Sequence, residues 1–250
     1  MHFAVDNSEI AQDQSVRTGK LCSELRTTQM ANEVYYSKIF SNFSVYAKVH
    51  TGLDHKEFSE QLKNNPTAID KLVESSKRHY RGQKLSQDDL PQTFFGDRGE
   101  WKIDKLPGAF FANGYIVVQQ KCFDVFSKFD LGGTEMVPAK IYQVDRKTEV
   151  EGPFYVFNFG CVKDTFLLDK STNMNGPLKS PFIPKPIWTD PLIPKDNQIA
   201  VSLLALDGPD LWFEKELSRI IFMSGRLRDA LKAEKLHVPF KFYKCRVVGE

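Results

Sequence analysis

From about residue 100 onward, short apolar or alternating runs are separated by glycine, proline, asparagine and aspartate. The runs are GYIVVQQ, EMVPAKIYQV, GPFYVFNFGCV, TFLLD and QIAVSLLALD. Runs of this length fit β-strands, since helices of globular proteins need longer stretches. Two segments between them, at 122–129 and 227–231, place apolar residues at helical spacing on one face. We therefore expect a mixed α/β protein whose C-terminal part contains two strand–helix–strand units.

The two predicted units resemble each other in sequence. Ile116 aligns with Ile221, and Asp124 aligns with Asp229 at the same shift. Extended backward, the alignment brings Leu106 onto Leu211, and each copy is followed by a Val-Pro pair and strand-like residues. Either an internal duplication or two independent strand–helix–strand units would give this pattern.

The first third of the chain has a different texture. Aromatic and β-branched residues predict strands at 35–40 and 43–49. Two short helices are expected within 54–81, where Asp54 and Glu57 form a possible capping box and Pro66 suits a first helical turn. We divide the chain into residues 1–87, a smaller helical segment that is possibly not independent, and residues 88–250, the α/β domain.

A proline-rich loop is expected at 170–197, which holds six of the 13 prolines. Proline removes backbone donors and favours extended structure, so neither a helix nor a central strand is predicted. Aromatic and charged side chains on such a semi-rigid loop suit protein recognition. The candidate partner-binding residues are Trp188, Lys185, Asp190, Phe182 and Lys179. The alternative is that Trp188 only fixes the loop to its own domain.

Ser224 follows an apolar run in RIIFMSGRLRDAL, where an α/β enzyme can place a nucleophile. The first glycine of the G-x-S-x-G elbow is missing, and none of the five histidines lies in a partner motif. We therefore interpret Ser224 as a helix N-cap. Gly132-Gly133 lacks the Lys-Ser/Thr of a phosphate loop and is expected to end a helix. No catalytic residue, metal ligand or cofactor is predicted.

The composition of the chain limits the kinds of partner and the cellular compartment that we expect for the protein. The formal charge of the 250 residues is +2, which gives no sign of a nucleic-acid partner. No run of about 18 apolar residues predicts a membrane helix, and the N-terminal residues are too acidic for a signal peptide. The four cysteines are widely spaced and fit free thiols. We expect a cytoplasmic protein with no membrane association and leave its oligomeric state open.

Over residues 88–248 the chain resembles the immunity protein eleven family of bacterial polymorphic-toxin systems. The resemblance is carried by LALDGPDLWFEKELSRIIFMSGRLRDALKAEKLHVPFKFYKC and, upstream, by LPGAFFANGYIVVQQKCFDVFSKFDLGGTEMVPAKIY. It implies a protein that is not an enzyme and that binds and neutralises a cognate toxin effector. Occlusion of the toxin's active site is the mechanism expected of such a partner.

Two other functions stay open from the sequence. A local acidic stretch holds Asp88, Asp89, Asp97, Glu100 and Asp104. A hydrolase or transferase would use the part of it near Asp97–Asp104 together with His79 or His237. The simpler interpretation of the acids is a solvated linker. A non-enzymatic adaptor would recruit a partner through the N-terminal helices. The basic stretch 75–84, with Tyr80 among its cations, could contact RNA or phosphate, although a positively charged helix end explains it as well.

Overall fold

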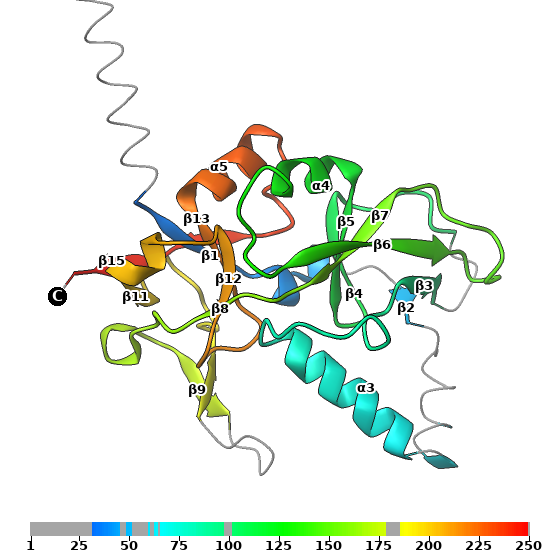
Figure 1. The fold of residues 1–250 in the computed structure, drawn as a ribbon, viewed down its shortest axis with the longest axis horizontal. Helices are drawn as coiled ribbons and strands as arrows, with labels where there is room; N and C mark the ends of the chain where they lie inside the picture. The colour runs from blue at the N-terminus through cyan, green and yellow to red at the C-terminus, as the bar shows by residue number, and fades with distance from the viewer. Residues whose placement is uncertain are drawn as a thin grey trace, which may run out of the picture.

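The structure, a computed structural model, describes residues 32–45, 49–51, 60, 63–64, 66–97, 102–178 and 186–249. These residues form a mixed α/β fold, which confirms the predicted fold class. Helix α4 (Gln120–Phe126) and helix α5 (Gly225–Ala233) lie at one end of the molecule, and helix α3 (Pro66–His79) lies at the other (Figure 1). None of the described helices is long and apolar enough to cross a membrane.

Two larger sheets carry the fold. The first has six strands in the order β2 (Val49–His50), β3 (Thr93–Gly96), β6 (Glu135–Tyr142), β7 (Phe154–Asn158), β5 (Tyr115–Gln119) and β4 (Ala109–Ala112). The second has five strands in the order β14 (Phe242–Lys244), β1 (Val34–Ser37), β13 (Ile221–Ser224), β12 (Leu211–Glu214) and β8 (Val162–Lys163).

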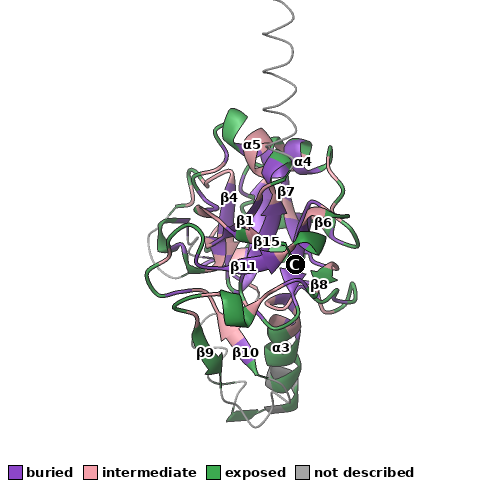
Figure 2. Ribbon diagram, turned by 90° about the vertical axis from the view of Figure 1, so that its left-hand side faces the viewer, coloured by how far each residue is buried: buried purple, intermediate pink, exposed green. Residues whose placement is uncertain are grey.

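Two small sheets complete the strand arrangement. Strands β9 (Asn175–Leu178) and β10 (Ile187–Thr189) pair antiparallel, and β11 (Ala200–Ser202) pairs in parallel with β15 (Arg246–Val248). The β9–β10 pair arises from the proline-rich segment, for which no helix or central strand was expected. It stands outside the two larger sheets, as that expectation requires. Its strand β9 is exposed at every position (Figure 2).

The two strand–helix–strand units have the same spatial order of strands and the same strand register. In the first unit the strand order is β4-β5-β7-β6, and in the second it is β12-β13-β1-β14. All neighbours within both groups are antiparallel. Val117 pairs with Phe110 and Val156, and at the equivalent position Phe222 pairs with Trp212 and Tyr36. This agreement supports an internal duplication.

The structural alignment differs from the sequence alignment outside the strand–helix core. Ala109, not Leu106, is equivalent to Leu211, because the β12–β13 connection is longer than the two-residue β4–β5 turn. Pro138 lies inside β6, whereas Pro239 precedes β14. The Val-Pro pairs are therefore not equivalent, since the register is determined by strand pairing.

The second unit takes its middle strand from the N-terminal part of the chain. In the first unit, β7 follows the helix, but in the second the equivalent position is filled by β1. Helix α4 packs on β5 and β7, and α5 packs correspondingly on β13 and β1. The two helices also contact each other (Figure 1). Residues from 34 to 85 contribute to both hydrophobic cores together with residues beyond 100.

The predicted strand at 43–49 is wrong at its start. Residues Phe43–Val45 form a 3₁₀ helix, Val49 and His50 enter a sheet as β2, and residues 46–48 lie outside the described part of the chain. Phe43 is exposed, so the aromatic content that suggested a strand does not reflect burial here. The expected helix at Pro66 is confirmed as α3, whereas Asp54 and Glu57 lie outside the described residues.

Tyr36 provides a test of how β1 packs against its neighbours β13 and β14. Its side chain is fully buried against Phe222 and Tyr243, yet its hydroxyl has no hydrogen-bond partner among the described residues. Tyr36→Ala should lower the free energy of unfolding by about 3–5 kcal/mol because a large cavity replaces the ring. Tyr36→Phe should raise it by about 1 kcal/mol because an unsatisfied buried hydroxyl is removed. Chemical denaturation measures both, and a destabilised Tyr36→Phe variant would contradict the assignment.

Candidate functional site

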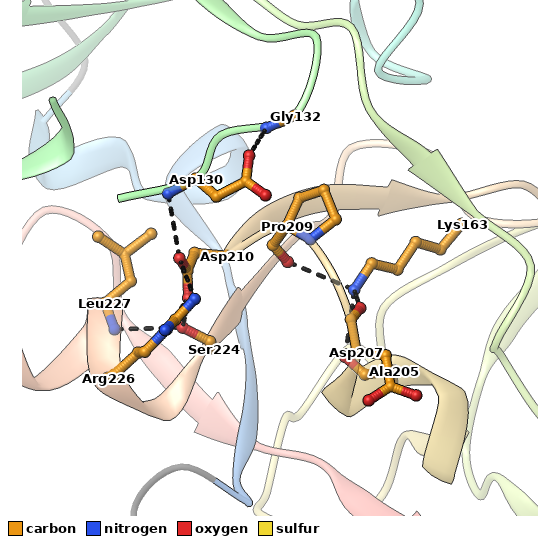
Figure 3. A network of polar contacts seen from close by, with 10 residues as sticks. All are labelled: Asp130, Gly132, Lys163, Ala205, Asp207, Pro209, Asp210, Ser224, Arg226 and Leu227. Carbon is orange, nitrogen blue, oxygen red and sulfur yellow. Dashed lines mark hydrogen bonds and ion pairs between the residues drawn. The ribbon is translucent and has the colours of Figure 1, made fainter. Parts of the chain in front are cut away.

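Ser224 is confirmed as the N-cap of α5. Its side chain accepts a hydrogen bond from the backbone N–H of Leu227 at 3.2 Å and donates one to Asp210 (Figure 3). Asp210 is buried and also accepts two bonds from the Arg226 guanidinium, from Nε at 2.5 Å and from Nη2 at 2.8 Å. Gln119, the equivalent cap of α4, makes no such side-chain bond. The Ser224 hydroxyl is thus part of a structural network that connects β12, β13 and α5.

Two other charged groups, the half-buried Lys163 and the buried Glu214, form hydrogen bonds within the chain. Lys163 donates to three backbone carbonyl oxygens, including that of Asp207 at 2.7 Å (Figure 3). Its ammonium group lies 3.8 Å from the Trp212 ring centre. Burial lowers the pKa of Lys163. Glu214 accepts from the Trp212 indole at 2.8 Å and from two backbone amides at 165 and 166. Such bonds offset the cost of burying a charge.

Among the described residues, His79 of the enzyme alternative lies beside aromatic rings. Burial alone lowers the pKa of His79 to about 3, with no contribution from a charged group. Its ring lies 4.7 Å from the ring of Tyr115 and 4.9 Å from that of Phe159. Asp89 forms an ion pair with Lys71 at 2.9 Å. Within the described ranges, no group of three or more His, Cys, Asp or Glu residues is arranged to hold a metal. Glu100 lies outside those ranges.

Trp188 fixes the β9–β10 hairpin to the rest of the chain. Its backbone N–H donates to the Glu216 carbonyl at 2.8 Å, and its carbonyl accepts from the Ser218 N–H at 3.0 Å. The indole is half-buried against the smaller hydrophobic core and contacts Gly176. Trp188 therefore positions the loop, and the interpretation of its ring as a partner contact stays a prediction.

The other four predicted contact residues fall in two groups. Asp190 forms an ion pair with Lys38 at 2.7 Å, and both side chains are mostly buried. This pair connects the end of β10 with the residue that follows β1. Lys179, Phe182 and Lys185 lie outside the described residues.

A hollow of about 460 Å³ lies between the C-terminal end of α3 and the β9–β10 hairpin. We name it the basic hollow because its lining includes four cations and one carboxylate. The cations are Lys77, Arg78, Arg81 and Arg219, and the carboxylate is that of Glu74. Three separate parts of the chain meet here, around residues 77–83, 175–189 and 218–219. The basic stretch and the proline-rich segment, considered separately in the sequence, thus share one surface.

A second hollow, of about 450 Å³, borders the other flank of the hairpin. We name it the loop hollow. Leu192 and Ile193 line it, and their side chains are 81% and 76% exposed. Asn175 lines both hollows, so the two are neighbours on the surface. We refer to the two hollows and the hairpin between them as the hairpin face, which lies at the end of the molecule opposite α4 and α5 (Figures 1 and 2).

The loop that carries Leu192 and Ile193 is fixed at both ends. Pro191 is buried, and Asp190 is held by Lys38. On the other side, Asp196 accepts from the Lys244 N–H at 2.8 Å, and the Lys195 N–H donates to Gln198 at 2.6 Å. Two large apolar side chains are therefore displayed to solvent on an anchored backbone. From the sequence, the apolar character of Leu192 and Ile193 suggested burial, whereas both are exposed in the structure.

Comparison with known proteins gives no family assignment. No protein-family model matches the chain, and no curated protein matches it in sequence. The resemblance over residues 88–248 therefore stays a prediction, and the functional argument depends on the geometry of the hairpin face.

The pH dependence of stability tests whether His79 is buried away from water among its aromatic neighbours. The folded-state pKa of about 3 lies below the ordinary value of 6.5, so protonation favours the unfolded chain and stability is lost as pH falls below 6.5. Each pH unit in that window should cost about 1.4 kcal/mol. Denaturation at pH 7 and pH 5 should show about 2 kcal/mol more loss in the wild type than in His79→Phe. Equal losses would show that His79 is accessible to protons in the folded state.

Proposed function

We propose that this protein is a non-enzymatic binding protein that neutralises a cognate toxin effector in the bacterial cytoplasm. It does so by covering the effector's active site with the hairpin face. The observation that carries the proposal is the pair of exposed neighbours Leu192 and Ile193 on an anchored loop beside a hollow. Exposed apolar side chains with an adjacent concave surface are typical of protein interaction sites.

Rigidity of the loop supports a role in tight binding. Association loses free energy when a mobile loop has to be ordered, and a loop that is already held avoids that loss. The Lys38–Asp190 ion pair and the Asp196–Lys244 hydrogen bond hold this loop without a partner. Trp188 fixes the neighbouring strand through backbone bonds to residues 216 and 218. The face is therefore prepared for a partner in advance.

Four polar side chains that are used within the chain support binding rather than catalysis. Ser224, Asp210, Lys163 and Glu214 each direct their polar atoms toward other groups of the same chain. A catalytic group instead directs its reacting atom toward a substrate within hydrogen-bond reach. The C-terminal resemblance to immunity proteins agrees with this proposal and adds the class of partner.

The experiment is co-expression of the full chain with the product of the neighbouring gene in a bacterial host. We expect restored growth and a stable complex with the wild-type chain. The double variant L192D/I193D should lose protection, with the dissociation constant raised at least about 30-fold, which corresponds to about 2 kcal/mol. Isothermal titration calorimetry with the purified proteins measures that change.

L203D/L204D is the matched control, because Leu203 and Leu204 are also adjacent and exposed but lie in the 3₁₀ helix Leu203–Leu206, which lines neither hollow. It should protect as the wild type does. Equal protection by both double variants would contradict the assignment of the hairpin face. Absence of both a complex and protection with the wild-type chain would contradict the proposed function itself.

A further inference from the structure

The basic hollow concentrates positive charge that the whole-chain balance of +2 conceals. Four cations and one carboxylate line a space of about 460 Å³. The carboxylate, Glu74, already lies 3.9 Å from Lys77 in an ion pair. Once Glu74 is paired with Lys77, the remaining positive charge of the basic hollow comes from its arginines.

These arginines differ from others in the fold in how they are paired. Arg226 forms an ion pair with Asp210, and Arg228 forms one with Asp229 at 2.6 Å. In the described part of the chain, the three arginines of the basic hollow form no ion pair with a carboxylate; they are Arg78, Arg81 and Arg219. A planar guanidinium can donate two parallel hydrogen bonds to one carboxylate. Arginines that line a hollow without a carboxylate partner can therefore bind an oxyanion there.

Two of the three guanidinium groups are held in place by other contacts. One Arg78 Nη2 donates to the Lys84 carbonyl at 2.6 Å. The Arg219 guanidinium lies 4.4 Å from the Tyr80 ring centre, and the Arg219 N–H donates to the Tyr80 carbonyl at 2.8 Å. Asp89 already forms an ion pair with Lys71. The hydrogen bond from Lys71 is the main cause that lowers the pKa of Asp89, and the charge of Arg78 contributes less.

Arg219 has a backbone φ of 63°, a left-handed conformation that is uncommon for a residue other than glycine. Strained backbone of this kind clusters at functional sites when the surrounding structure holds it. Here the surrounding structure is the Tyr80 contact and the pairing of residues 216–218 with Trp188.

The segment that carries Arg219 is also where the second unit departs from the first. The β4–β5 strands are connected by Asn113 and Gly114 alone, whereas residues 215–220 connect β12 and β13. The longer connection reaches both β10 and the end of α3. It therefore builds the basic hollow, and nothing equivalent extends from the shorter turn.

We propose that the basic hollow binds the carboxylates of an acidic segment of the partner protein. This inference rests on the proposed function and adds the chemistry of the partner. Because Asn175 lines both the basic hollow and the loop hollow, a segment that reaches both carries carboxylates next to apolar side chains. The carboxylates lie over Arg81 and Arg219, and the apolar side chains lie over Leu192 and Ile193. A positive hollow of this kind also accelerates encounter with an acidic partner.

The test uses the full chain and two fluorescein-labelled peptide probes, one of alternating aspartate and leucine and one of alternating lysine and leucine. Fluorescence anisotropy should show binding of the aspartate probe only, with affinity that falls as salt rises because the contact is charged. The charge-swap variant R81E/R219E should weaken that binding at least tenfold. R81E alone should weaken it at least threefold, which keeps the test valid should the double variant fold poorly.

The matched control is K128E/K232E, which makes the same change in net charge at exposed positions following α4 and within α5. It should bind the aspartate probe as the wild type does. An equal loss in both double variants, or preference for the lysine probe, would overturn the proposal. Tighter binding of a single-stranded RNA oligonucleotide, lost in R81E/R219E, would overturn it in favour of a nucleic-acid partner.

The outcomes separate this inference from the proposed function. If the neighbouring gene's product is neutralised equally well by the wild type and R81E/R219E at low and high salt, the inference is wrong and the function stands. If the aspartate probe binds at the basic hollow but no toxin is neutralised, the function is wrong and the anionic site stands.

Discussion

The insertion of β1 between β13 and β14 is the interaction on which the rest of the structure depends. Its neighbours on both sides come from near the C-terminus, and it is the middle strand that the second unit would otherwise lack. Tyr36 fills the core at the position where the first unit has Val156. Directly after the strand, Lys38 holds Asp190 and with it the end of β10. One strand therefore completes a sheet and also anchors the loop that carries the exposed apolar pair.

The duplicated topology separates scaffold from function. The two units have equivalent strand registers and pack in the same way, with one helix covering two neighbouring strands. What differs is the connection between the first two strands. In the second unit this connection is longer, contacts Trp188 and Tyr80, and brings Arg219 to the basic hollow. The basic hollow thus lies where the second unit has the longer connection, while the strands of the two units pair in the same way.

Local features of the fold could be predicted from the sequence. The alternation of short runs and amphipathic segments predicts the mixed α/β class, Pro66 predicts the start of α3, and Ser224 predicts the cap of α5. Each of these depends on residues close together in the chain. The partners of β1 could not be predicted, because strand pairing across nearly the whole chain leaves no local pattern. Phe43–Val45 misled for a related reason, since aromatic residues predict strands only where they become buried.

The candidate site was visible only in parts. The basic stretch and the proline-rich segment were both singled out, but nothing local indicated that they meet. The sequence suggested the indole of Trp188 as a partner contact, whereas in the structure the backbone of Trp188 fixes the hairpin through hydrogen bonds. The more exposed neighbours, Leu192 and Ile193, looked ordinary beside it. Burial, which decides between an anchor and a contact residue, depends on tertiary packing that a single sequence does not reveal.

The most direct test of the central claim is hydrogen–deuterium exchange of the full chain, free and bound to the product of the neighbouring gene. The hairpin face predicts slower exchange on binding at residues 173–178, 187–198 and 216–219. Helices α4 and α5, at the opposite end of the molecule, should exchange at unchanged rates (Figure 1). Slower exchange confined to α4 and α5, with the hairpin unchanged, would contradict the account.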